Sequence, residues 1–122
     1  MTTIAIPRSR ATAAFLWTLQ IVTAALFLMA GLSKLAGAAV MVQLFNAIGV
    51  GQWFRYATGT IEVVAATLLL VPSLAFFGAA LLIPTMVGAI FTHLFIVGGN
   101  PSMPIALLAS ATAIAWMKWN ER

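Results

Sequence analysis

Four long apolar runs, separated by segments that contain glycine or proline, constrain this chain more than any other feature of its sequence. Of its 122 residues, 63% are hydrophobic and only eight are charged, six basic and two acidic. A helix needs about 20 predominantly apolar residues to cross the hydrocarbon layer of a bilayer. Because a segment in lipid must satisfy its backbone hydrogen bonds internally, these runs predict membrane-spanning helices.

The runs end at residues that commonly stop helices, such as Pro72 and the segment 98–101. No linker and no shift in composition divides the chain, so we predict a single transmembrane domain, 1–122. Its fold class is all-α, a membrane four-helix bundle with the lipid bilayer as its surroundings. The predicted spans are residues 11–33, 56–71, 74–97 and 104–119.

The segment between the first two spans is too long for a tight turn, and glycines interrupt it too often for another span. Its apolar residues recur at helical spacing with polar residues between them. This pattern predicts a short amphipathic helix over residues 38–50 that lies in the membrane interface. A packed loop is the alternative. The apolar positions are Val40, Met41, Leu44, Phe45 and Ile48.

The basic residues indicate how the chain is oriented. The net charge of +4 comes from basic residues that flank the apolar runs, as residues that determine membrane topology do, so nucleic-acid binding is not predicted. The positive-inside rule places both termini in the cytoplasm. Four basic residues, Arg8, Arg10, Lys118 and Arg122, lie on the side of the termini, and two, Lys34 and Arg55, lie on the other.

The absence of cysteine limits the chemistry of the chain. Disulfides, iron–sulfur clusters and thiolate metal sites all need cysteine, and the sequence has none. The methionines are scattered and are interpreted as packing residues. We therefore predict no metal site and assign no catalytic residue.

Three ionisable residues, Glu62, His93 and Lys34, form the candidate functional site. Glu62 follows Tyr56 by about 9 Å of helix, and His93 precedes Gly98 by about 8 Å, at 1.5 Å per residue. Because these two spans run in opposite directions, both side chains are expected at one depth, and Lys34 ends the first span on the same side. Ionisable groups in lipid are costly and usually functional, so we expect a polar pocket near the non-cytoplasmic face.

Small and polar residues share one face of each of the first three spans. In lipid the hydrophobic effect does not drive helices to associate, and small residues allow the close approach on which their packing depends. Thr58 and Thr92 join the ligand-site or proton-site candidates because they lie one turn from Glu62 or directly beside His93. The predicted helix-packing residues are Gly31, Gly59 and Gly88.

Each ionisable residue also has a structural interpretation. Glu62 can neutralise Lys34 or accept from nearby donors as a tie between helices. His93 can be a packing histidine, and Lys34 an ordinary helix-end residue whose ammonium reaches the interface.

Several short motifs occur in order along the chain. The sequence AGLSKL (residues 30–35) closes the first run, Gly59-x-x-Glu62 opens the second, LLLVP (68–72) ends it, and Gly88-Ala89 precedes His93. Together, over residues 15–116, they make the chain resemble the DoxX-like family of small four-helix membrane proteins. The resemblance implies that Gly31, Lys34, Gly59, Glu62 and His93 are family positions. The family takes its name from a membrane subunit of a thiosulfate:quinone oxidoreductase, and some relatives look like accessory or assembly factors.

The leading hypothesis is a small subunit or accessory protein of a redox system in the bacterial cytoplasmic membrane. Glu62, His93 and Lys34 would line a pocket for a quinone headgroup or another small polar ligand. A membrane or soluble redox partner would supply the electrons, so the chain would be at most a subunit of an oxidoreductase. An oligomer is compatible with the sequence.

Two alternatives stay open, with a remote third. A structural or assembly role for a larger membrane protein would use the interfacial segment and the apolar surface. A proton-coupled small-molecule transporter would use the membrane acid, although in the small multidrug transporters the acid lies in the first helix. Binding of haem or chlorophyll through His93 is remote, because one histidine per chain excludes a bis-histidine site.

Overall fold

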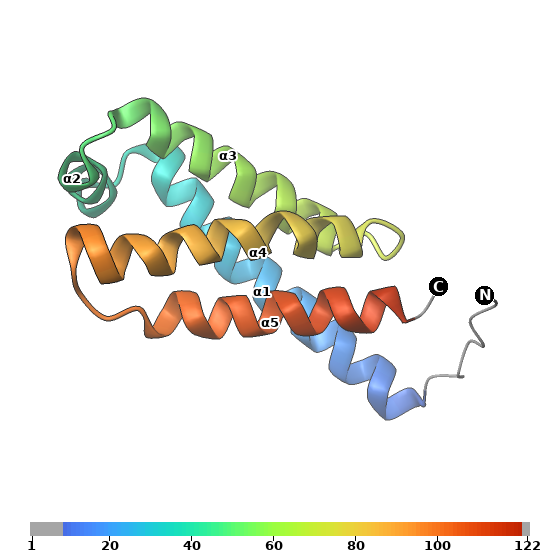
Figure 1. The fold of residues 1–122 in the computed structure, drawn as a ribbon. Helices are drawn as coiled ribbons and strands as arrows, with labels where there is room; N and C mark the ends of the chain where they lie inside the picture. Colours follow the sequence, from blue (N-terminus) through green and yellow to red (C-terminus); the bar gives the residue numbers. More distant parts are fainter. Residues whose placement is uncertain (1–8, 121–122) are drawn as a thin grey trace.

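The computed structural model describes residues 9–120, and within them it contains helices and no strand. Arg8 and Arg122, used above for orientation, lie outside the described residues. Figure 1 shows how the elements are arranged. They are α1 (Arg10–Ala36), α2 (Ala39–Ile48), α3 (Gln52–Leu69), α4 (Ala75–Thr92), the π-helix η1 (His93–Val97) and α5 (Ser102–Trp119).

The predicted all-α class is confirmed, and the predicted spans correspond to α1, α3, α4 with η1, and α5. The largest difference in a boundary is at α3, which begins at Gln52 and not at residue 56. The polar residues that start α3 find hydrogen-bond partners within the protein. Gln52 Nε2 donates to the Val42 carbonyl at 3.1 Å and to Asn46 Oδ1 at 2.9 Å. The first turn of α3 is therefore helical although it carries Gln52 and Arg55.

Two helices in the described part of the chain are long and apolar enough to cross a membrane. They are Arg10–Ala36 and the continuous stretch Ala75–Val97. The helices α3 and α5, with 18 residues each, are shorter and are not apolar enough over their length to be counted with them. The four-span bundle is thus supported for the first and third spans and stays a prediction for the other two.

The long helices pack as neighbouring pairs. The closest pairs are α1 with α3 and α4 with α5, and α3 with α4 and α1 with α5 are also in contact. Figure 1 shows α2 and the α4–α5 connection at one end of the molecule, with the start of α1 and the end of α5 at the other. Because the start of α1 and the end of α5 lie at the same end of the molecule, the arrangement is compatible with an even number of membrane spans.

The segment between α1 and α3 forms the helix predicted for it and not a loop. In Figure 1, α2 is seen almost end-on, whereas α3, α4 and α5 run across the view. It contacts α3, η1 and α1. Its position at a membrane interface stays a prediction.

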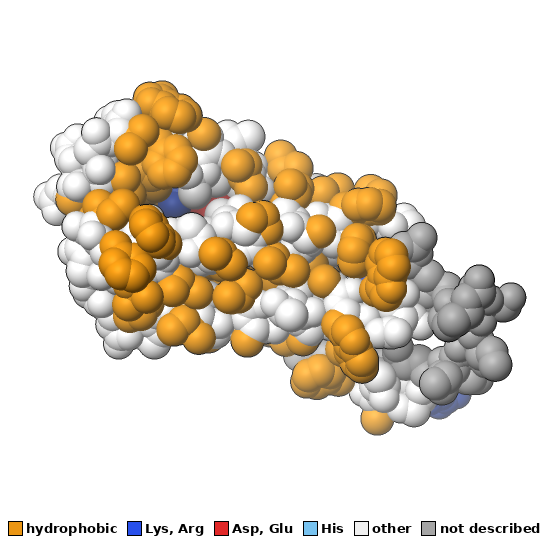
Figure 2. Space-filling model, in the orientation of Figure 1, with side chains coloured by type: hydrophobic (Ala, Val, Ile, Leu, Met, Phe, Trp, Pro, Cys, Tyr) orange, Lys and Arg blue, Asp and Glu red, His pale blue; other side chains and the backbone are white. Residues whose placement is uncertain are grey.

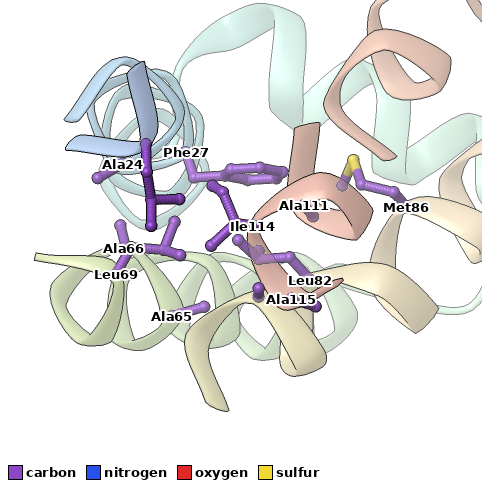
Figure 3. Packing of buried hydrophobic residues seen from close by; sticks show 12 residues of the cluster. Ala24, Phe27, Ala65, Ala66, Leu69, Leu82, Met86, Ala111, Ile114 and Ala115 are labelled. Carbon is purple, nitrogen blue, oxygen red and sulfur yellow. The ribbon is translucent and has the colours of Figure 1, made fainter. Parts of the chain in front are cut away.

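The core is formed by a few large side chains embedded among alanines. Phe27, Leu69, Leu82 and Ile114 are fully buried, and Figure 3 shows Phe27, Leu82 and Ile114 converging between the helices. Alanine leaves room for helices to approach closely, which van der Waals packing in lipid requires. The alanines in this cluster include Ala24, Ala65, Ala66, Ala79 and Ala111.

The outer surface is strongly apolar. Large side chains such as Phe95, which is 72% exposed, point outward along all of the long helices, and Figure 2 shows them distributed over the visible face. Soluble monomers rarely expose contiguous apolar patches of more than a few hundred Å². This surface suits a lipid environment.

Candidate functional site

The helices α1 and α3 cross at two glycines, Gly31 and Gly59. A Cβ atom at Gly31 would lie 2.8 Å from the Gly59 carbonyl oxygen and 2.8 Å from Val63 Cγ2. A Cβ atom at Gly59 would lie 3.0 Å from the Gly31 carbonyl oxygen. No larger residue fits unless the helices move apart. This close approach brings the neighbouring turns, which carry Lys34 and Glu62, within reach of each other.

Lys34 and Glu62 form a buried ion pair. Lys34 Nζ lies 2.8 Å from Glu62 Oε1, and the two side chains are 12% and 3% exposed. The lysine stem passes directly over Gly59, since a Cβ at that glycine would be 3.0 Å from Lys34 Cβ. Figure 2 shows basic and acidic side chains side by side, recessed among apolar ones. The ammonium therefore points into the protein and not outward along α1.

The ion pair retains unused hydrogen-bonding capacity. A carboxylate offers about four acceptor positions and an ammonium three donors. Within residues 9–120, neither charged group has another hydrogen-bond or ion-pair partner besides the other. Burying two charges is costly, and the attraction between them compensates only when the remaining donors and acceptors are also satisfied. The pair is thus suited to a polar ligand that both donates and accepts.

Arg55 is a third charged residue at this end of the molecule, and its role was missed in the sequence. It is only 5% exposed. Its Nη1 donates to the carbonyl oxygen of Lys34, and its Nε donates to Gln52 Oε1 at 2.6 Å. The guanidinium carbon also lies 4.3 Å from the centre of the Tyr56 ring. A signal was present, because Arg55, Gly59 and Glu62 share one helical face.

The structure places His93 at the first position of η1, where it is half-buried. Its Nδ1 lies 3.0 Å from the Gly98 carbonyl oxygen. A carbonyl oxygen can only accept, so Nδ1 carries the proton and Nε2 of the neutral ring is an acceptor. No hydrogen bond or ion pair in the described chain joins His93 to Glu62 or Lys34. The element η1 does contact α2, at the same end of the molecule.

The two threonine candidates use their hydroxyl groups within their own helices. Thr58 donates to the Phe54 carbonyl and Thr92 donates to the Gly88 carbonyl, each at 2.8 Å. Both side chains are half-buried. A hydroxyl that donates to the backbone keeps its acceptor lone pairs, so these residues can accept a hydrogen bond from a ligand.

The third glycine expected to pack, Gly88, does not lie at a close helix contact in residues 9–120. It is exposed, and a Cβ there would meet no atom within 4 Å. The close contact between α3 and α4 is made by Gly78, where a Cβ would lie 2.7 Å from the Ala65 carbonyl oxygen. The two helices are close near the turn that joins them, and Figure 1 shows them diverging toward the end that carries α2.

Two further buried polar residues tie helices together outside the ion pair. Gln20 Nε2 donates to the Leu69 carbonyl oxygen at 2.8 Å, and the hydroxyl groups of Thr23 and Ser110 are hydrogen-bonded to each other. Gln20 thereby satisfies the carbonyl group of the last residue of α3. Both hydrogen bonds join two helices, α1 to α3 and α1 to α5.

A model of the DoxX-like family matches residues 18–116 of the chain. The match includes the glycine crossing, the ion pair, Arg55 and His93. No curated protein and no solved structure matches the chain. Groups of three or more histidine and acidic side chains that could hold a metal ion do not occur in residues 9–120.

Proposed function

The chain belongs to the DoxX-like family, and from this premise we propose that it is a small subunit or accessory protein of a quinone-linked membrane system. Family membership and the two apolar helices indicate a small membrane protein. The proposed ligand site is the Lys34–Glu62 pair, at the end of the molecule that carries α2.

The buried ion pair carries this proposal. A tie between two helices can be made by apolar packing, and replacing a buried ion pair with apolar residues is often neutral or stabilising. A retained pair with free donors and acceptors has a use beyond holding α1 against α3. A quinone oxygen can accept from the Lys34 ammonium, and a quinol hydroxyl can donate to Glu62.

Proton exchange gives the other residues their roles. As the headgroup takes up two electrons from a partner redox protein, each of its oxygens takes up a proton that comes from water, and Glu62 can relay one by first accepting it and then releasing it to the headgroup. His93 holds its Nδ1 proton on the Gly98 carbonyl, so its Nε2 is the atom that accepts and releases protons. We place this end of the molecule at the non-cytoplasmic face, with the start of α1 and the end of α5 toward the cytoplasm.

The proposal is tested by measuring quinone retention. The protein is purified from its native membrane in mild detergent, and quinones are extracted and quantified by mass spectrometry. We expect quinone with the wild type and clear losses in Glu62→Gln and His93→Ala. The control is Thr60→Val, which changes an exposed side chain on the opposite face of α3. Equal quinone content in all four proteins would contradict the proposal.

An assembly role is the second candidate, and the surface formed by η1 and the end of α4 favours it. Four large apolar side chains in this short stretch are at least half exposed and do not belong to the core. If this surface docks a larger membrane protein, deleting the gene should lower the abundance of that partner, and charge-site variants should restore it. These side chains are Phe91, Leu94, Phe95 and Ile96.

A further inference from the structure

The direction of the Lys34 side chain is unusual for its place in the helix. Lys34 lies in the last turn of α1. A lysine there normally keeps its ammonium near the last carbonyl groups, which carry the negative end of the helix dipole, or extends it to the interface. Here the ammonium instead turns inward to Glu62 and is largely buried. Something other than the helix end must hold it there.

Arg55, a residue of α3, contacts the C-terminal end of α1. Its Nη1 donates to the backbone carbonyl of Lys34 itself. That carbonyl also accepts from the N–H of Gly37, which ends α1 in the left-handed conformation with φ of 75°. A Cβ at Gly37 would lie 3.5 Å from Arg55 Nη1, so the guanidinium packs closely against the helix end. The end of α1 is thus neutralised by a cation from α3.

The position of Arg55 is itself fixed by its neighbours. Gln52 accepts from its Nε and, through its own amide, donates to the Val42 carbonyl and to Asn46 of α2. The Tyr56 ring covers the guanidinium from another side. The hydrogen bonds therefore run without interruption from α2 through Gln52 and Arg55 to Lys34.

We infer that Arg55 is a positioning residue that directs the Lys34 ammonium inward to Glu62. Arg55 donates a hydrogen bond to the Lys34 carbonyl oxygen at the end of α1, and its positive charge repels a second cation from that end. Lys34 is then left with the buried carboxylate as its favourable partner. The significance of this role rests on the proposed function, because Lys34 would otherwise leave the ligand site.

The inference is tested by acylation of lysine, because the chain has only two lysines, Lys34 and Lys118. The full protein in detergent is treated with a water-soluble amine-acylating reagent, and the rate at each lysine is followed by mass spectrometry. A charge-assisted hydrogen bond shifts a two-state equilibrium by about tenfold or more. We therefore expect Arg55→Gln to raise the rate at Lys34 by about tenfold, with Lys118 unchanged as the internal reference.

Two further variants keep the test decisive. Arg55→Lys retains the positive charge at the helix end and should restore slow acylation of Lys34. Gln52→Leu is a milder change that removes the partner of Arg55 Nε. It should raise the acylation rate at Lys34 by a smaller factor, and it serves as the test if Arg55→Gln does not fold.

Two results would overturn the inference. One is an unchanged Lys34 rate in folded Arg55→Gln or, if that variant does not fold, in Gln52→Leu. The other is a wild-type Lys34 that already reacts as fast as it does in the unfolded chain. The readout is independent of quinone. Faster acylation in Arg55→Gln without quinone in the wild type would leave the positioning role standing and refute the proposed function.

Discussion

The glycine crossing predicts that Gly31→Ala will separate α1 from α3, whereas Gly88→Ala will be tolerated. At Gly31 the new Cβ would meet two backbone atoms, the Gly59 carbonyl oxygen at 2.8 Å and the Val63 nitrogen at 3.1 Å. Backbone cannot rotate away as a side chain can, so the helices must shift. At Gly88, also within a helix, the Cβ would meet nothing within 4 Å.

The magnitude follows from comparing the two variants. Replacing glycine by alanine inside a helix gains up to about 1 kcal/mol from helix propensity at either position. Overpacking a close contact costs about 1 to 3 kcal/mol. Because the propensity gain cancels in the difference, Gly31→Ala should be less stable than Gly88→Ala by about 1 to 3 kcal/mol.

The assay is equilibrium unfolding in detergent micelles, followed by circular dichroism under one set of conditions for the wild type and both variants. Gly88→Ala should be at least as stable as the wild type. Equal stabilities of Gly31→Ala and Gly88→Ala would refute this prediction, because the two helices would then have room for a Cβ atom at the crossing.

Three further predictions use the same chain. Removing one partner of the ion pair, as in Lys34→Met, should destabilise by about 3 to 5 kcal/mol, whereas the double variant Lys34→Met/Glu62→Leu should regain most of that loss; no recovery in unfolding experiments would argue against a simple ion pair. Gln20→Leu should cost about 1 to 3 kcal/mol by leaving the Leu69 carbonyl without its donor, and Thr18→Val, which alters an exposed hydroxyl on α1, should cost much less. The chain lacks cysteine, so a single cysteine introduced at Asn46 or at Asn120 is the only thiol in its variant. The two variants should react with a membrane-impermeant thiol reagent from opposite sides of the membrane; reaction of both from the same side would contradict the placement of these two residues at opposite faces.

The helices and their inward faces could be predicted because both depend on local pattern. Apolar runs and their glycine and proline boundaries determine where helices begin and end, and Gln20, Thr23, Phe27 and Gly31 form one stripe that is buried in the structure. Counting residues from the ends of the spans predicted one depth for Glu62 and His93, and Lys34 was expected on the same side because it ends the first span. The structure joins them at 2.8 Å, and their role as a ligand site stays a proposal.

The features that were missed depend on how helices cross, which no local pattern records. Gly78 and Gly88 both lie on α4 among apolar residues, yet only Gly78 meets α3, because the helices diverge between them. The helix α3 begins before the predicted span because Gln52, a polar residue at its start, is satisfied by α2. Arg55 was read as a topology signal because its partner is a backbone carbonyl, which any residue could supply.

The contacts between α1 and α3 divide the candidate site into a fixed part and an adjustable part. Each of these helices satisfies a carbonyl near the C-terminal end of the other, through Arg55 at one end and Gln20 at the other, and the glycine crossing locks them between. The ion pair belongs wholly to this unit. His93 belongs to η1, after the point where α4 has diverged from α3, and its hydrogen bond stays within its own loop. A shift of η1 would therefore change the distance from His93 to Glu62 without disturbing the ion pair, so a ligand that engages all three residues would act chiefly on the position of η1.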